Sequence, residues 1–225
     1  MKTRLYINLT NQCNVRCPFC CMYSAPDKST FITFDVVKRI VDETDDLFEF
    51  QLEGGEPLLH KDFFLFLEYA VSTGRCIKII ILSNGILVDK YLKRIIDFAN
   101  WNKVKVEFKL SLNYYLVDEF QKMGRDIYKE YAKLAFAIKY IENVDVKLNV
   151  RLRNEVDEHI REDLKEQHLD AIANVFYLQA YGRMTGANYD KPVIVQNIDD
   201  WRIFASDGRC FGKDLILRSE YEKGL

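Results

Sequence analysis

The chain has 225 residues, with 32 basic and 34 acidic side chains and a formal net charge of -2. This length supports one sizeable hydrophobic core and is short for two domains. The charge argues against a dedicated nucleic-acid surface, which is usually basic. No apolar run is long enough to cross a bilayer, and the first six residues lack a signal-peptide pattern, so the sequence predicts a cytosolic protein with neither membrane nor nucleic acid as partner.

Strand-like and helix-like patterns alternate along the chain. Strands are predicted at residues 4–10, 48–52, 77–82, 104–112, 146–152 and 175–179. Helical periodicity follows Thr33, a predicted N-cap, and recurs in 63–71, 92–99, 118–142 with an interruption at Gly124, and 160–172. Interior strands read as continuous apolar runs, as in sheets that are covered on both faces.

Such alternation predicts parallel strands joined by right-handed crossovers. About six units give an α/β fold, a partial (β/α)6 TIM-like barrel, over residues 1–184. Residues 185–225 are predicted to form a short C-terminal extension of uncertain structure. In folds of this kind the chemistry lies at the carboxyl ends of the strands, where the polar and glycine-rich segments of this chain also fall.

Four of the six cysteines lie in one short segment after the first predicted strand. Disulfides rarely persist in the cytosol, so the segment indicates a metal or redox site. The spacing Cys13-x3-Cys17-x2-Cys20 lets three thiolates from one loop hold one face of a four-iron cluster, and a fourth iron then stays open to another ligand. Two alternatives are a structural zinc site, for which the sequence shows no second ligand pair, and a redox pair formed by Cys17 and Cys20.

Later motifs make a family resemblance specific. Leu52-Glu53-Gly54-Gly55-Glu56-Pro57 follows the second predicted strand, Ser83-Asn84-Gly85 the third, and Ser111-Leu112-Asn113 ends the fourth. Together with the cysteine loop, this order resembles the radical S-adenosylmethionine (radical SAM) superfamily, in the style of its molybdenum-cofactor and peptide-maturase branches. The resemblance covers roughly residues 4–184.

The resemblance implies a [4Fe-4S] cluster and S-adenosylmethionine as cofactors. By it, Cys13, Cys17 and Cys20 bind three irons, and the amino and carboxylate groups of S-adenosylmethionine bind the fourth. Glycines allow a close backbone approach to the methionyl group, and the acidic side chain after them accepts a hydrogen bond from its ammonium. The implied cofactor-binding residues are Phe19, Gly54, Gly55, Glu56, Ser83, Asn84, Ser111, Asn113, Asn149 and Arg151. For Ser111 the alternative is a strand-end cap, and for Arg151 a solvated side chain.

Two of the three remaining cysteines have two interpretations each. Cys210 is either a packing residue or a catalytic thiol that donates a hydrogen atom, and Cys21 has the same two readings beside the cluster. Cys76 opens an apolar strand and is interpreted as a core residue. The segment that begins at Cys210 faintly resembles the start of an auxiliary-cluster domain, so either that domain is absent or this chain is a truncated form.

The implied function is reductive cleavage of S-adenosylmethionine to a 5′-deoxyadenosyl radical that abstracts hydrogen from a substrate. The motif style favours modification of a ribosomally made peptide. Alternatives are a radical enzyme on a nucleotide, sugar or cofactor precursor, an activase of a glycyl-radical enzyme, and a non-catalytic iron–sulfur sensor. The expected electron donor is a flavodoxin or ferredoxin-type protein.

Overall fold

The protein is represented by a computed structural model that describes residues 2–187 and 200–225. Its chain forms two compact units. One comprises the residues up to Leu82 together with those from Gln179 onward, and the other runs from Ser83 to Leu178. The predicted boundary after residue 184 stays a prediction. No helix among the described residues is long and apolar enough to cross a membrane.

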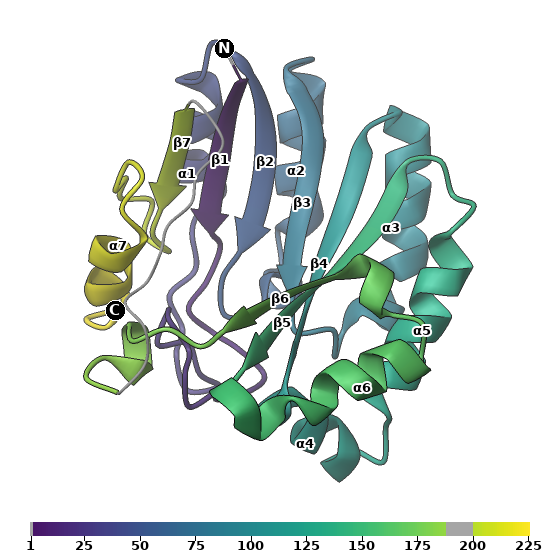
Figure 1. Cartoon of the computed structure of the whole chain (residues 1–225). Coiled ribbons are helices and arrows are strands. Elements are labelled where there is room, and N and C mark those ends of the chain that lie inside the picture. The colour runs from purple at the N-terminus through teal and green to yellow at the C-terminus, as the bar shows by residue number, and fades with distance from the viewer. Residues whose placement is uncertain (1, 188–199) are drawn as a thin grey trace. The chain divides into compact units, whose positions relative to one another are not determined.

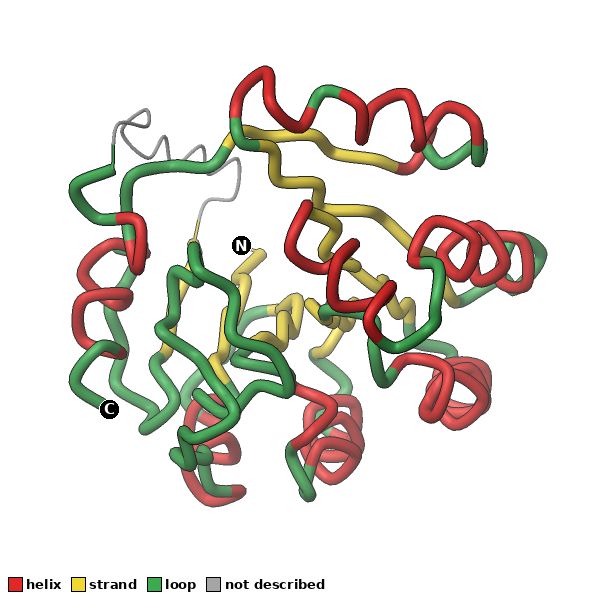
Figure 2. The backbone as a smooth tube through the Cα atoms, turned by 90° about the horizontal axis from the view of Figure 1, so that it is seen from below, coloured by secondary structure: helices red, strands yellow, loops and turns green. Residues whose placement is uncertain are grey.

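The first unit contains a parallel sheet in the order β3-β2-β1-β7 (Figure 1). Its strands are β1 (Lys2–Asn8), β2 (Leu47–Glu53), β3 (Cys76–Ser83) and β7 (Asp200–Phe204). Its helices are α1 (Phe34–Asp42), α2 (Phe63–Ser72), α7 (Leu215–Glu222) and the short 3-10 turns η1 (Pro57–Leu59) and η4 (Gly182–Met184). Apolar residues of α1 and α2, among them Val37, Phe66 and Leu67, are buried. Figures 1 and 2 show α1 and α2 on the same side of this sheet.

The central strands of this unit separate apolar and polar side chains. Leu5 and Ile7 of β1 share one face, because side chains alternate along a strand. Tyr6 and Asn8 lie on the other face and are buried too. In β2 the same alternation places Phe48 and Phe50 on one face, where both are buried and their ring centroids lie 6.2 Å apart. The prediction of continuous apolar runs is therefore wrong for β1 and β2, whereas β3 comes close to it.

The strand β7 lies in the predicted C-terminal extension. It pairs in parallel with β1, in the register Tyr6↔Ile203. Trp201 stacks on Tyr6, with ring centroids 5.5 Å apart. Sequence analysis missed this strand because it has only five residues and two of them are charged. The extension thus adds a seventh strand and, through α7, another helix to the predicted set.

The second unit contains the parallel strands β4 (Lys105–Asn113), β5 (Val144–Leu152) and β6 (Ala173–Tyr177), in that order. Its helices are α3 (Val88–Asn102), α4 (Tyr114–Lys122), α5 (Ile127–Ile138) and α6 (His159–Glu166), with the 3-10 turns η2 (Asn154–Asp157) and η3 (Asp170–Ile172). The predicted interruption at Gly124 is confirmed, since this residue has φ +69° between α4 and α5. Strands β4 and β5 also alternate apolar and polar residues.

Candidate cluster and cofactor site

The first half of the cysteine loop is held by the segment that follows β2. The amide of Gly55 donates to the carbonyl of Thr10 at 2.6 Å, and the amide of Glu56 donates to that of Gln12 at 2.9 Å. Cys13 is buried, and its amide donates to the carbonyl of Ala25 at 3.1 Å. The two motifs identified in the sequence therefore lie against each other through their backbones.

Glycine is required at both positions of this contact. A Cβ on Gly54 would lie 2.6 Å from the carbonyl oxygen of Thr10, and one on Gly55 would overlap the carbonyl of Gln12. Real side chains do not approach backbone so closely, so each glycine allows the cysteine loop to pack on the end of β2. The predicted approach of these glycines to the methionyl group stays a prediction, and the structure gives them a second role.

Glu56 is fully buried. One of its carboxylate oxygens accepts from the amide of Leu58 at 3.3 Å and so caps η1. The preceding strand and the following Pro57 fix the backbone on both sides, which sets the direction of this side chain. Its predicted hydrogen bond to an ammonium group is not tested by these contacts.

The second half of the cysteine loop is held by Arg183, in η4. Its guanidinium donates to the carbonyls of Cys17 at 2.7 Å, Tyr23 at 2.9 Å and Ser24 at 2.9 Å. Its backbone amide donates to the carbonyl of Cys20 at 3.1 Å. One residue from far along the chain therefore binds four carbonyls of the loop. Sequence analysis missed Arg183, because no motif or periodicity marks it.

Two neighbours complete this contact. Gly182 has φ +63°, and a Cβ there would overlap Cys21 and lie 2.8 Å from the carbonyl oxygen of Cys20. Its own carbonyl accepts from the hydroxyl of Tyr23 at 2.8 Å. The hydroxyl of Ser219, in α7, donates to the carbonyl of Cys21. The backbone from Cys17 to Ser24 is thus fixed by the C-terminal part of the same unit.

The three candidate ligands differ in exposure: Cys13 is buried, while Cys17 and Cys20 are half-buried. Within the described residues, no group of three or more His, Cys, Asp or Glu side chains is placed to hold a single metal ion. A four-iron cluster is larger than one ion, and each cysteine binds a different iron, so its ligands do not need to converge on one point. The chemistry of the donor set and the fixed backbone on both sides of it fit a cluster.

A buried polar network adjoins this loop. Arg218, in α7, is 1% exposed and forms an ion pair with Glu53 at the end of β2. The hydroxyl of Tyr6 donates to the same carboxylate, and the guanidinium carbon lies 4.8 Å from the centroid of its ring. Burial alone would lower the pKa of Arg218, but Glu53, Tyr6, Cys21 and Glu222 act together against it, and the net effect is a raised pKa. Buried charges are tolerated only when they are paired in this way.

A second carboxylate, Glu222, extends the network along α7. It accepts from the side-chain amide of Asn8 at 2.6 Å, from the backbone amide of Ser206 at 2.7 Å and from the hydroxyl of that residue at 2.9 Å. Burial raises its pKa, although these hydrogen bonds act in the opposite direction. The network anchors α7 on the carboxyl ends of β1 and β2, beside the cysteine loop.

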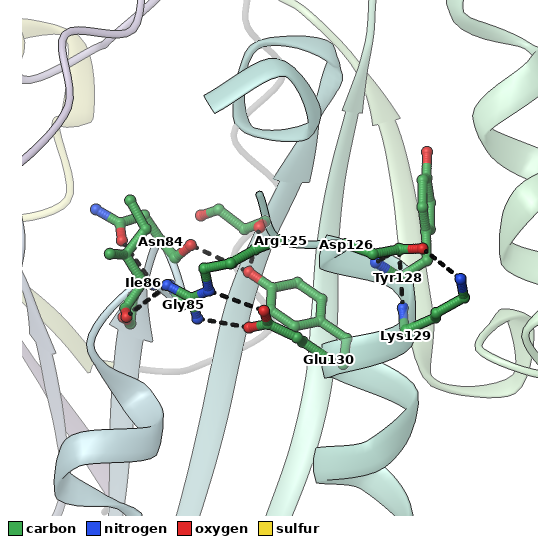
Figure 3. A network of polar contacts seen from close by, with 11 residues as sticks. Asn84, Gly85, Ile86, Arg125, Asp126, Tyr128, Lys129 and Glu130 are labelled. Carbon is green, nitrogen blue, oxygen red and sulfur yellow. Dashed lines mark hydrogen bonds and ion pairs between the residues drawn. The ribbon is translucent and has the colours of Figure 1, made fainter. Parts of the chain in front are cut away.

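A polar network in the second unit holds the turn after β3 (Figure 3). This unit contains the predicted site residues Ser83, Asn84, Ser111, Asn113, Asn149 and Arg151. The hydroxyl of Tyr131, in α5, lies 3.1 Å from the carbonyl oxygen of Asn84 and 3.0 Å from that of Ser111. Gly85 has φ +85°, and a side chain there would overlap the Tyr131 ring. Arg125 donates to the carbonyl of Ile86 at 3.2 Å.

Most polar side chains predicted at these strand ends have local partners. The hydroxyl of Ser83 accepts from the amide of Gly85 at 3.0 Å, and the Asn84 side chain from that of Ile86 at 3.1 Å. Asn113 is the N-cap of α4, and its side chain accepts from the amide of Leu116 at 2.9 Å. These contacts shape the turns. Cofactor binding by these residues stays a prediction.

Asn149 and Arg151 lie on the same face of β5, two residues apart, as predicted. In register, Asn149 lies opposite Ser111 and Arg151 opposite Asn113. The guanidinium carbon of Arg151 lies 4.5 Å from the centroid of the Phe176 ring. The four candidates Ser111, Asn113, Asn149 and Arg151 therefore form one polar patch on β4 and β5.

The remaining cysteines lie in different environments. Burial, followed by the nearby Cys20, raises the pKa of Cys21 to about 12. Burial also raises the pKa of Cys76 to about 12, and this residue starts β3 at the end of the sheet away from the cysteine loop. Cys210 is exposed in the turn after β7, where its backbone pairs with that of Phe204 in an isolated antiparallel β-bridge. Its predicted catalytic role is not tested by this placement. Thr33 is the N-cap residue of α1, but its side chain makes no capping hydrogen bond.

Residues 7–166 match the model of the radical SAM superfamily, which is more than half of the chain. The protein therefore belongs to the radical SAM superfamily, a family of enzymes that use a [4Fe-4S] cluster and S-adenosylmethionine. The matched residues contain the cysteine loop, the segment after β2 and the patch on β4 and β5.

Curated relatives carry two names. GTP 3′,8-cyclase from Synechocystis sp. (strain ATCC 27184 / PCC 6803 / Kazusa) is 33% identical over 93 residues, which are 40% of this chain and 28% of the cyclase. The S-adenosylmethionine-dependent nucleotide dehydratase of Selenomonas ruminantium is 32% identical over 91 residues, which are 39% of this chain and 32% of the dehydratase. The chain spans about a third of the length of these relatives.

Similar solved structures include two that contain bound peptides. Native anSMEcpe with bound AdoMet and the Kp18Cys peptide has a TM-score of 0.60 at 19% identity, over 84% of this chain and 56% of that one. Streptococcus suis SuiB bound to its precursor peptide SuiA has a TM-score of 0.59 at 20% identity, over 81% and 40%. This similarity shows the fold alone and confirms the predicted fold class, the α/β partial-barrel class of the superfamily.

Proposed function

We propose that this chain is a radical SAM enzyme that modifies a peptide. The observation that carries the radical assignment is the docking of the cysteine loop on Gly54-Gly55-Glu56, because the two motifs of the family meet through direct backbone hydrogen bonds. Cys13, Cys17 and Cys20 hold the cluster in this proposal. When bound, the cluster supplies the electron that cleaves S-adenosylmethionine to a 5′-deoxyadenosyl radical.

The residues of the chain orient and shield the reacting groups. The glycines and the buried Glu56 present backbone and carboxylate next to the cysteine loop, where an ammonium group would gain a charge-assisted hydrogen bond. The patch on β4 and β5, with Ser111 and Asn113, offers hydroxyl and amide groups for a ribose. Cys13 is buried while Cys17 and Cys20 are half-buried, and this partial exclusion of water would protect a radical from side reactions.

A peptide substrate is supported by two observations. The similar structures of anSMEcpe and SuiB hold peptides. In the first unit Arg4 pairs with Glu49 and Arg218 pairs with Glu53, so the charges of these two guanidinium groups are already neutralised. A triphosphate would need basic side chains in excess, whereas a neutral amide would not.

A nucleotide substrate is the second candidate, favoured by the sequence similarity to GTP 3′,8-cyclase over part of the chain. The glycyl-radical activase and the sensor have no such support. A flavodoxin or ferredoxin-type electron donor and a cytosolic location remain predictions.

Anaerobic reconstitution tests the radical assignment. The protein is loaded with iron and sulfide, reduced with dithionite and given S-adenosylmethionine, and 5′-deoxyadenosine is measured by chromatography. The wild type should form it. Cys17→Ala should abolish it, whereas Cys76→Ala, far from the loop, should not. A loaded four-iron protein that forms none with any substrate supplied would favour the sensor.

Substrate class is tested in the same assay. The peptide proposal predicts no acceleration of 5′-deoxyadenosine formation by GTP and a clear acceleration by synthetic peptides encoded in small reading frames next to its gene. Acceleration by GTP, with a cyclised nucleotide as product, would replace the peptide with the nucleotide candidate.

A further inference from the structure

Arg183 stands out among the groups that the proposed chemistry does not yet use. Its three side-chain hydrogen bonds all go to backbone carbonyls between Cys17 and Ser24. A guanidinium has five N–H donors in a rigid, planar fork, so a single side chain can fix several acceptors at set angles. A stretch of loop that lacks regular secondary structure is thereby given a defined shape.

Among the described residues, no acidic side chain neutralises the charge of Arg183. Within the described residues, no carboxylate forms an ion pair with Arg183. By contrast, Arg16, which lies in the cysteine loop, pairs with Asp27 at 2.5 Å. Arg183 is also half-buried, whereas Arg16 and Asp27 are both exposed. Solvent screens a charge less as its burial increases, so the positive charge of Arg183 acts on its surroundings more strongly than that of Arg16.

We infer that Arg183 is a positioning residue for the cluster and also favours its reduced state. This inference rests on the proposed function, because it concerns Cys17 and Cys20 as ligands. The guanidinium holds the carbonyl of Cys17, and its backbone amide holds that of Cys20, so both ligand-bearing residues are fixed from one point. Reduction adds one negative charge to the cluster, and a neighbouring positive charge stabilises the reduced form.

Geometry and charge are separable by substitution. Arg183→Lys keeps the charge and loses the planar fork, since the three donors of an ammonium all lie on one nitrogen. Arg183→Gln loses the charge and keeps a planar group with two donors. Arg183→Met loses both. Arg16→Gln is the matched control, because it removes a paired and exposed arginine from the cysteine loop.

The first measurement is iron per chain after anaerobic reconstitution and gel filtration. Arg183→Lys and Arg183→Met should retain at least about twofold less iron than the wild type, because the ligand-bearing loop is no longer fixed. Arg16→Gln should retain the wild-type amount. Equal iron in every variant would overturn the positioning role.

The second measurement is the ratio of reduced to oxidised cluster in a poised redox titration, read by electron paramagnetic resonance on protein that carries iron. Arg183→Gln and Arg183→Met should show this ratio lowered by about threefold or more at a fixed potential. Arg183→Lys and Arg16→Gln should match the wild type. An unchanged ratio in Arg183→Gln would overturn the electrostatic role.

Measurements on the wild-type protein distinguish a failure of this inference from a failure of the proposed function on which it rests. If the wild type takes up no four-iron cluster, the proposed function fails before Arg183 is examined. If the wild type is loaded and forms 5′-deoxyadenosine while all Arg183 variants behave like it, the proposed function stands and only the inference about Arg183 fails.

Discussion

The two halves of the cysteine loop are held in different ways. Its first half, from Thr10 to Cys13, lies against the segment after β2, about forty residues along the chain, and is fixed by backbone hydrogen bonds that glycines make possible. Its second half, from Cys17 to Ser24, is fixed by side chains and backbone of η4 and α7, more than 150 residues away. The family motif thus secures one half, and the C-terminal part of the first unit secures the other.

The largest effect is expected from Arg218→Met. This substitution leaves the buried Glu53 carboxylate without its cation, and removing one partner of a buried ion pair costs about 3–5 kcal/mol of the free energy of unfolding. Ser219, which follows Arg218 directly in α7, donates to the carbonyl of Cys21, so the second half of the cysteine loop should also be held less firmly. Urea unfolding measures the loss. The double variant Arg218→Met/Glu53→Gln should recover part of it, and a single-variant loss below about 1 kcal/mol would mean that the pair does not anchor α7.

Gly55→Ala addresses the first half. The new methyl group would overlap the carbonyl of Gln12, so the loop must move away from β2, at a cost of about 3 kcal/mol. In the protein without a cluster, Cys13 should become accessible to alkylation, which mass spectrometry locates. Gly74→Ala is the control, since nothing lies within 4 Å of its Cβ, and its φ of +69° alone costs about 1 kcal/mol. Equal losses in the two variants would contradict the docking of the loop on Gly55.

Gly182→Ala tests the second half of the cysteine loop, and Gly186→Ala is its matched control. Both glycines have positive φ, +63° and +86°, so the backbone strain of alanine is similar. Only at Gly182 would the methyl group meet the cysteine loop, at an additional cost of about 2 kcal/mol. Cys17 and Cys20 should gain alkylation in Gly182→Ala while Cys13 keeps its protection. Exposure of all three cysteines together would show that the halves are not independent.

The smallest effect concerns pH. His60 accepts from the amide of Asp62 at 3.1 Å and lies 2.9 Å from the carbonyl oxygen of Ile32, an arrangement that suits the neutral ring. Burial lowers the pKa of His60 below its ordinary value of 6.5. The unfolded chain therefore binds a proton more readily than the folded one, and stability should fall as the pH drops below about 6.5. His60→Gln should flatten this part of the curve of melting temperature against pH, and an unchanged slope would exclude His60 as its source.

The difference between the two halves of the cysteine loop also explains which features the sequence could predict. The three cysteines, the glycines and Glu56 are predicted as site residues because short motifs at strand ends mark them, and the fold class follows from the alternation of strands and helices. The strand β7 was missed because five residues with two charges carry no clear period. Arg183, Ser219 and Arg218 were missed because their roles depend on contacts across most of the chain, which spacing does not reveal. Motifs also did not show that Asn84 and Asn113 have local partners in turns.

The central claim is that Cys13, Cys17 and Cys20 hold a four-iron cluster whose fourth iron binds S-adenosylmethionine. Electron paramagnetic resonance of the reduced, reconstituted protein tests it most directly, with spectra taken before and after S-adenosylmethionine is added. The account predicts a four-iron signal that changes on addition, and no such signal in Cys17→Ala. A well-loaded cluster with a spectrum that S-adenosylmethionine leaves unchanged would contradict it.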